Sequence, residues 1–365
     1  MTDEPTQPTP ARKTINFSQL LKPVLTLYHS DNLKERGRLW NLGLIALTVF
    51  TVMSLIGLWW NRDPSAFDVQ AAAQKRAEHY NEKIVTGYVT TNTLIEVASR
   101  LRDKSGGYLS NDIMPPSVFM DDMPSWEWGV LQQVRDFSKA LRNDISRSRT
   151  QSEDPDLAKA EPKFNTDNNS WFWPTSEHKY QEGIALLEKY LHRLTVTSST
   201  RAQFLVGADN LGDWLEDVIK RLGNMSQRLS TSVGQTRLNT PLVDNEADTD
   251  TQQSTPEPLK IEEKTPWMEI DNVFHEARGT CYALIHLLRA IEIDFKEVLE
   301  RKNAMMILQE IIRELEVTQK TVWSPMILNG SEFGLVANHS LVLSSYISRA
   351  NMGIIELDKI LLGRN

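Results

Sequence analysis

Residues 38–62 read RLWNLGLIALTVFTVMSLIGLWWNR, and this stretch decides how the chain is divided. No charged side chain occurs over the 23 positions of Leu39–Asn61, and arginines flank them at Arg38 and Arg62. A helix of this length spans about 35 Å at about 1.5 Å per residue, whereas the hydrocarbon core of a bilayer is about 30 Å thick. The stretch therefore predicts a single transmembrane helix at residues 39–61.

A buried core helix and a cleaved signal peptide both fit this stretch less well. A core helix of this length would rarely be apolar on every face. A signal peptide has an apolar region of about 7–15 residues behind a short basic start. Here 38 mostly polar residues come first, and the nearest Ala-x-Ala, at residues 71–73, lies too far beyond. Trp40 and Trp59-Trp60 suit the aromatic belts at the two membrane surfaces, which favours an uncleaved anchor.

Basic residues near the two ends of the anchor predict its orientation. Residues 31–40 carry three basic side chains, whereas residues 61–70 carry only Arg62. Cytoplasmic flanks of transmembrane helices carry the excess of lysine and arginine. We therefore expect a cytoplasmic N-terminus and a body in the periplasm.

The charge of the body excludes some classes of partner. Residues 1–40 have a net charge of +2 and residues 41–60 have none, so the remainder must carry −10 to give the total of −8. An acidic body argues against nucleic acid, whose phosphates require a basic surface, and against adsorption to anionic lipid. The single cysteine, Cys281, excludes an intrachain disulfide, and its place on an apolar stripe favours a core residue over a nucleophile.

Apolar residues recur every three or four positions through most of the body, which predicts helices. Such stripes run from residue 64 to about 104, from Trp126 to Ile145, from Tyr180 to Leu194 behind an N-cap at Thr175 or Ser176, from about 199 to 230, from Ala277 to Leu315 with a break near Asn303, and from Ser331 or Glu332 to Leu361. No run of alternating strand residues is present. The predicted fold is all-α, with one N-terminal transmembrane helix followed by a helical-bundle body.

The most regular stripe lies in the C-terminal part. Its members step like the a and d positions of about three heptads: Ala277, Cys281, Leu284, Leu288, Ile291, Phe295 and Val298. This spacing predicts long coiled-coil-like helices, with the seam packed either within the body or between two chains.

Polar segments mark the predicted boundaries. Ser146–Ser170, with two prolines, is expected to be a loop, and Thr231–Thr265 a flexible linker, because it cannot bury enough apolar surface to offset chain entropy. Ile15–Tyr28 could form a short helix at the membrane or prolong the anchor. The expected organisation is a cytoplasmic tail (1–38), the anchor (39–61), a first helical part (62–230), the linker (231–265) and a helical C-terminal part (266–365).

Few residues suggest chemistry. Glu127, between Trp126 and Trp128 and near Asp121-Asp122, could be a carboxylic acid of raised pKa that cleaves glycan. The favoured interpretation is a helix start, where acidic residues are stabilised by the helix dipole.

Metal and phosphate sites are not supported. His275 and His286 share a helical face but stand about 16 Å apart by helix rise, too far for one metal ion. A His-Glu-x-x-His motif would need its second histidine where Gly279 stands, so ordinary polar-face histidines are preferred. Gly106-Gly107 follows no strand and is not a phosphate loop. We predict no catalytic, cofactor-binding or metal-binding residue.

An aromatic cluster, Trp171-Phe172-Trp173, allows two interpretations. It could be an exposed patch for a partner. Packing on the following helix as a hydrophobic staple is favoured.

Several motifs resemble one known family. They are Gly106-Gly107-Tyr108-Leu109-Ser110-Asn111-Asp112, Pro115-Pro116, Trp126-Glu127-Trp128-Gly129 and Trp171-Phe172-Trp173-Pro174, behind a short tail and one anchor. The layout beyond residue 30 resembles an uncharacterised inner-membrane family of Gram-negative bacteria, known only as a domain of unknown function. The resemblance implies a compartment but no activity, and no functional residue carries over.

The sequence thus favours a membrane-anchored periplasmic protein that acts as an envelope interaction or scaffold module rather than as an enzyme. The expected partners are membrane lipid, through the anchor, and an envelope protein or a second copy of the chain. No nucleic acid and no cofactor are expected. The alternative is an envelope enzyme acting on glycan, with Glu127 as its acid.

Overall fold

The computed structural model describes residues 37–147, 153–196, 202–239, 259–322, 327 and 337–364. The chain divides into two compact units between Ile56 and Gly57. The first unit contains most of helix α3 (Arg38–Trp60), and the unit from Gly57 onward is the body. The helix considered for Ile15–Tyr28 lies outside the described residues.

The body is helical, as the stripes predict. Its helices are α4 (Val69–Tyr80), α5 (Tyr88–Asp103), α6 (Asp122–Ala140), α7 (Leu157–Phe164), α8 (Ser176–Thr195), α9 (Asp209–Ser230), α10 (Ile270–Asp294), α11 (Lys296–Arg301), α12 (Met305–Val317) and α13 (His339–Leu362). Short turns of helix are η1 (Ser117–Phe119), η2 (Leu141–Ile145), η3 (Thr231–Val233) and η4 (Trp267–Glu269).

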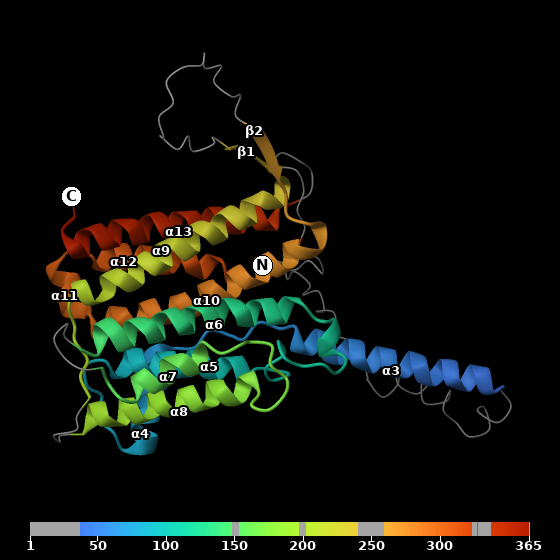
Figure 1. Cartoon of the computed structure of the whole chain (residues 1–365), viewed down its shortest axis with the longest axis horizontal. Helices are drawn as coiled ribbons and strands as arrows, with labels where there is room; N and C mark the ends of the chain where they lie inside the picture. The colour runs from blue at the N-terminus through green and yellow to red at the C-terminus, as the bar shows by residue number, and fades with distance from the viewer. Residues whose placement is uncertain are drawn as a thin grey trace, which may run out of the picture. The chain divides into compact units, whose positions relative to one another are not determined.

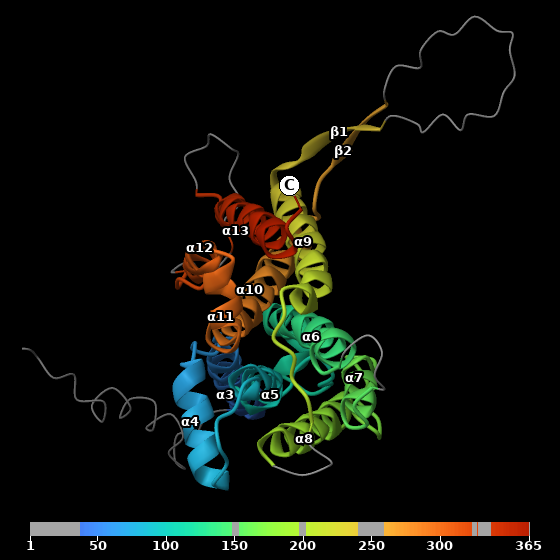
Figure 2. The same ribbon diagram turned by 90° about the vertical axis from the view of Figure 1, so that its left-hand side faces the viewer.

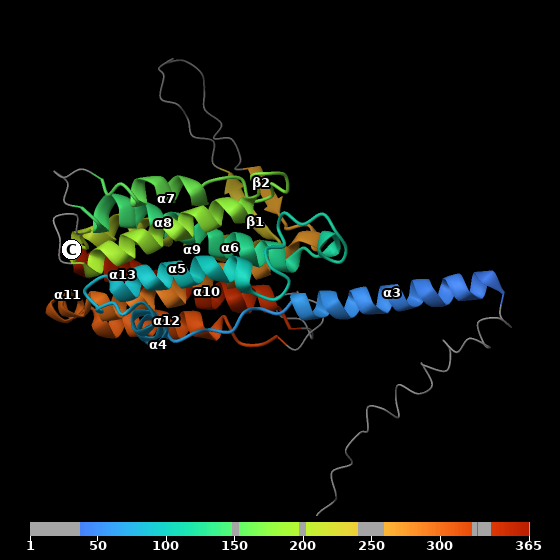
Figure 3. The same ribbon diagram turned by 90° about the horizontal axis from the view of Figure 1, so that it is seen from below.

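The body helices lie in three layers (Figure 1). α9, α12 and α13 form one outer layer, α6 and α10 the middle one, and α4, α5, α7 and α8 the other outer layer. Turned views show that, within this outer layer, α5 packs on the middle layer and contacts both α8 and α4 (Figures 2 and 3). Because α10 contacts helices of both outer layers, it is the central helix of the body.

The middle layer depends on two glycines that face each other. A Cβ added at Gly129 of α6 would lie 2.1 Å from the Glu276 carbonyl oxygen, and one added at Gly279 of α10 would lie 2.1 Å from the Trp126 carbonyl oxygen. Since the obstacle is backbone in both cases, no side-chain movement could make room. The two helices therefore cross in backbone contact.

The predicted stripes are confirmed for the best-patterned helices. Every member of the stripes of α6, α8 and α9 is buried, and so is each of the seven seam residues from Ala277 to Val298. The seam residues are buried within the body, where α10 contacts α5, α6, α9 and α12. Thr175 is the N-cap of α8, accepting a hydrogen bond from the His178 amide (3.3 Å). The expected break near Asn303 separates α11 from α12.

Some boundaries differ from the expectation. The pattern from residue 64 to 104 is two helices, because the chain turns between Asn81 and Gly87, both with positive φ (52° and 86°). Asparagine and glycine tolerate this left-handed conformation, so these two residues end α4 and begin α5. α9 begins at Asp209 rather than near residue 199. The described part of the last helix begins at His339, with Asn338 as its N-cap, and residues 328–336 lie outside the description.

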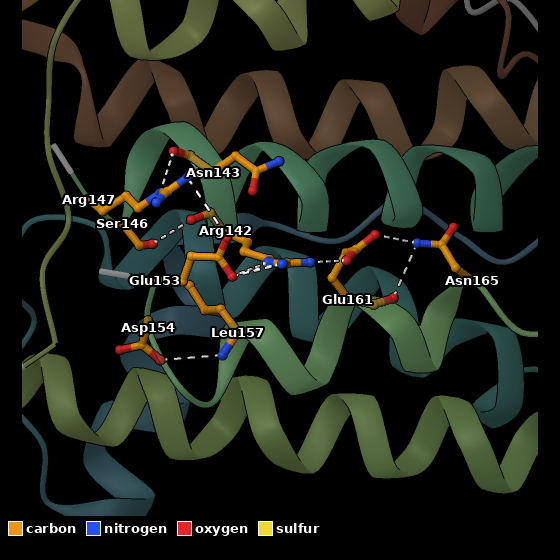
Figure 4. A network of polar contacts seen from close by, with 9 residues as sticks. All are labelled: Arg142, Asn143, Ser146, Arg147, Glu153, Asp154, Leu157, Glu161 and Asn165. Atoms are coloured by element: carbon orange, nitrogen blue, oxygen red, sulfur yellow. Dashed lines mark hydrogen bonds and ion pairs between the residues drawn. The ribbon is translucent and has the colours of Figure 1, made fainter. Parts of the chain in front are cut away.

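The segment expected to be a loop between residues 146 and 170 contains α7. Leu157, Ala160 and Phe164 are buried, which stabilises this short helix despite Pro162 within it. Arg142, in η2 directly after α6, forms ion pairs with Glu161 of α7 (2.6 Å) and with Glu153, just before α7 (2.7 Å) (Figure 4). Tertiary contacts thus outweigh the proline signal.

The segment expected to be a linker contains a two-stranded antiparallel ribbon. β1 (Gln235–Asn239) pairs with β2 (Leu259–Glu263), with Gln235 opposite Glu263. The intervening residues 240–258 lie outside the described part of the chain. Residues on both sides of the ribbon belong to the same compact body.

Candidate functional site

The most distinctive region of the body is the end where α6, α8 and α10 begin (Figure 1). Three segments meet there: residues 57–62, 105–121 and 165–175. Two hydrogen bonds join segment 105–121 to segment 165–175. The Asn111 side-chain amide donates to the Ser170 carbonyl (3.0 Å), and the Tyr108 hydroxyl donates to the Asn168 carbonyl (2.9 Å). We call this region the loop end.

Glu127 holds segment 105–121 in place. Its carboxylate is fully buried, forms an ion pair with Lys104 (2.7 Å), and accepts hydrogen bonds from the amides of Leu109 and Ser110 (both 2.8 Å). The Ser110 hydroxyl donates a further hydrogen bond, at 2.5 Å. Lys104 also donates to the Gly107 carbonyl. One carboxylate thus fixes the loop at several points.

This geometry decides what Glu127 can do. Burial raises the pKa of its carboxyl, while Lys104, Ser110 and the Leu109 amide act in the opposite direction. A catalytic acid must reach the atom that it protonates. Glu127 is 0 % exposed, and its two oxygens are bonded to Lys104, Leu109 and Ser110, so in this structure they hold the loop. Its role is to position the loop, which neither sequence interpretation included.

The last turn of α3 packs on the same loop. A Cβ at Gly57 would lie 3.7 Å from Pro116 Cβ and 3.9 Å from Met120 Sδ. The Trp60 ring covers Gly106, where a Cβ would come within 2.7 Å of the indole. Because Gly106 also has a φ of +86°, a larger residue there would be strained and would displace Trp60. Residues 57–60 and the loop are therefore fitted to each other.

The residues after α3 are tied to the central helix. Asn61 donates a hydrogen bond to Asp122 (2.9 Å), which lies at the start of α6. Asp63 forms an ion pair with Arg278 of α10 (2.7 Å). Arg278 is almost completely buried and also donates to the carbonyls of Thr318 and Lys320 beyond α12. A single guanidinium thus joins three separate parts of the body.

His286 completes this attachment. Its ring stacks on Phe67 (4.1 Å between centroids), its Nδ1 donates to the Tyr282 carbonyl (2.7 Å), and its Nε2 accepts the Phe67 amide (3.1 Å). Burial lowers the pKa of His286 to about 4, so the neutral ring is present at neutral pH. The expectation of a polar-face histidine was wrong for His286, because residue 67 of a distant segment covers it. His275 is partly exposed and lies 3.6 Å from Asp122.

The loop end exposes large apolar side chains. Ile113, Met114, Val118 and Phe119 project from one loop, and Trp171, Phe172 and Trp173 from the other. Phe119 is 82 % exposed and Phe172 is 72 % exposed. The favoured prediction that Trp171-Phe172-Trp173 is buried as a staple was therefore wrong, although the centroid of the Trp173 ring lies 4.3 Å from that of the His178 ring in α8. The alternative of an exposed cluster is correct, and a partner for it stays a prediction. These side chains form a concentration of exposed apolar residues at one end of the body.

A groove of about 850 Å³ lies elsewhere on the body, between residues 66–70 and the α10–α12 side. Two of its charged side chains have partners: Arg289 pairs with Glu316 (2.6 Å), and Glu292 accepts from Gln309 (2.7 Å). Within the described residues, no group of three His, Cys, Asp or Glu side chains could hold a metal ion. The loop end is therefore the stronger candidate site.

Only part of this site could be found from the sequence. The aromatic cluster and the glycine pair stood out as motifs. Asp63 with Arg278, and Phe67 with His286, did not, because these partners are 215 and 219 residues apart and no local pattern links them.

The chain belongs to the bacterial family described as "Uncharacterized protein conserved in bacteria (DUF2333)", whose model matches residues 33–363. This match confirms the family resemblance indicated by the motifs at residues 106–129 and 171–174. No match was found among curated proteins or among solved structures. The described residues include one helix, α3, that is long and apolar enough to cross a membrane.

Proposed function

We propose that α3 anchors the chain in the bacterial inner membrane as a single span, with the helical body in the periplasm. The observation that carries this proposal is that none of the 23 residues of α3 is buried by the described part of the chain. Side chains such as Leu47, Phe50 and Leu55 stay exposed. Leaving so much apolar surface in water is unfavourable, and lipid is the solvent that removes the cost.

The proposed orientation follows from charge. The three basic residues in 31–40 against Arg62 alone in 61–70 favour a cytoplasmic N-terminus. A phosphatase reporter that is active only in the periplasm, fused after Asn365, should then be active. A cytoplasm-active reporter at the same position is the matched control. Activity of the second reporter and silence of the first would reverse the orientation.

We further propose that the body acts by interaction, as an envelope scaffold or binding module. The exposed aromatic side chains of the loop end support a binding role, because such a surface is normally covered by a membrane or by another protein. Co-purification of the detergent-solubilised chain, with its mass measured, tests it. Recovery of a defined protein partner or of a stable oligomer is the expected result, and a monomer without partners would contradict it.

The alternative of a glycan-cleaving enzyme depends on Glu127, whose burial and bonds to the loop do not favour it, and one substitution tests it. Glu127→Gln removes the charge that balances the buried Lys104, and breaking a buried ion pair costs about 3–5 kcal/mol. We therefore expect a lower melting temperature and a more protease-sensitive loop at residues 105–121. Loss of biological function with unchanged stability would favour the enzyme instead. Glu300→Gln, at an exposed site on α11, is the control.

A further inference from the structure

The contact of Gly57, the first residue of the body, with the loop at residues 105–121 has a consequence for the exposed loops. Gly57 lies three residues before Trp60, so it is about 4.5 Å further along the helix toward the middle of the apolar stretch. Pro116 and Met120 are nevertheless the side chains that a Cβ at Gly57 would meet. The loop therefore touches the helix inside its apolar stretch, before Trp59 and Trp60, where the lipid headgroups are expected.

The composition of the two loops fits that depth. Residues 113–120 contain no charged side chain, and neither do residues 171–174. Tryptophan, phenylalanine and methionine are among the types exposed, and aromatic residues are enriched where a protein meets the membrane surface. The loops are also held in place, by Glu127 and by the bonds from Asn111 and Tyr108. Exposed apolar residues on fixed loops insert without a large loss of conformational freedom.

We infer that the loops at residues 105–121 and 165–175 dip into the lipid headgroup layer beside α3, through their exposed apolar side chains. This inference rests on the proposed membrane anchor. In this inference, lipid rather than a protein covers these exposed side chains. The reason is that the contact between Gly57 and the loop puts them at the level of the bilayer surface. The body is then held against the membrane at two places, by α3 and by the loop end.

The chain provides a direct test. Its single cysteine, Cys281, is fully buried and burial raises the pKa of its thiol to about 12, so it should not react with a thiol label in the folded protein. Four single variants of the full-length chain each introduce one cysteine: Phe119→Cys, Phe172→Cys, Leu47→Cys and Met306→Cys. Each carries an environment-sensitive fluorophore in phosphatidylcholine nanodiscs, with or without lipids that bear a nitroxide quencher near the headgroup.

Met306 is the matched control. It is 76 % exposed and apolar, like Phe119, but belongs to the start of α12, at the opposite end of the body (Figure 1). We expect quenching of about twofold or more at Phe119 and Phe172, since interfacial residues lie roughly 5–10 Å into the headgroup region. Met306 should show none.

Leu47 separates the two proposals. Quenching at Leu47 without quenching at Phe119 and Phe172 overturns the inference but leaves the proposed anchor intact. A protein partner would then be the remaining explanation of the exposed loops. No quenching at Leu47 overturns the anchor and the inference together. Equal quenching at Phe119, Phe172 and Met306 also overturns the inference, because the whole body would then lie in lipid without a specific contact.

Discussion

Helices α3 and α10 are similar in length, with 23 and 25 residues, yet their surroundings are opposite. None of the residues of α3 is buried by the described part of the chain, whereas 17 of those in α10 are. α3 has no charged side chain after Arg38, while α10 contains Arg278 and His286, both buried. α3 is apolar on every face, whereas α10 also carries polar side chains inside the body.

The difference lies in the partners of the polar groups. Arg278 has Asp63 and the carbonyls beyond α12, and His286 has the Phe67 amide and the Tyr282 carbonyl. Buried polar groups are tolerated when they are hydrogen-bonded. A core helix can therefore carry them when other segments supply partners, and this requirement makes α10 the place where the distant parts of the body meet.

The largest expected effect comes from placing a charge in each helix. Leu288→Asp at the centre of α10 loses the burial of a leucine, worth roughly 1.5–3 kcal/mol, and adds an unpaired buried charge. We expect a total loss above about 4 kcal/mol, seen as early melting or an unfolded body. Leu47→Asp should leave the melting of the body unchanged but weaken membrane integration, since a central charge costs about 2.5–3.5 kcal/mol on insertion scales.

Glu292→Ala, at a partly exposed position of α10, is the control and should change stability by less than about 0.5 kcal/mol. Unchanged melting of Leu288→Asp would mean that the centre of α10 is not buried, and the contrast between the two helices would fail.

A smaller effect is expected from pH. Burial lowers the pKa of His286 to about 4 from the ordinary 6.5, with Arg289 and Arg100 acting in the same direction and the bond to the Tyr282 carbonyl opposing it. Between pH 4 and pH 6.5 the histidine is protonated in the unfolded chain but neutral in the folded one, so lowering the pH favours unfolding. The contribution of neutral His286 is therefore complete above pH 6.5 and falls toward pH 4, by about 3 kcal/mol.

Urea unfolding of the body at several pH values measures this loss. His286→Leu should flatten the pH dependence in that window, although it also lowers stability at neutral pH. Parallel pH profiles for the two proteins would contradict the assignment. Because α3 has no titratable group after Arg38, membrane integration should not change over the same range.

The smallest expected effect comes from one methyl group. Gly279→Ala forces α6 and α10 apart, and overpacking of this kind costs about 1–3 kcal/mol. Gly43→Ala in α3 is the matched control, because no described atom lies within 4 Å of a Cβ built there. We expect a lower melting temperature for the first variant only. Equal melting of both would show that the crossing of α6 and α10 can relax.

The sequence by itself determined the features that depend on local periodicity. The apolar stretch at residues 39–61, the stripes of α6, α8 and α9, the seam of α10 and an N-cap at Thr175 or Ser176 all follow from residues that lie close together in the chain. Burial then follows the predicted face, because a helix with one apolar side must cover it. The all-α class followed in the same way, whereas the family was indicated by the resemblance of a few motifs.

The tertiary structure alone decided the features that depend on distant partners. α7 forms across Pro162 because Arg142 and the buried Phe164 hold it, and the ribbon needs residues 235 and 263 to meet. Glu127 positions the loop at residues 105–121 only because Lys104 and Ser110 both bond to its carboxylate. The physical reason is that periodicity shows only which face of a helix is apolar. The free energy of a buried charge depends on which segment packs against that charge, and so does the exposure of an aromatic residue.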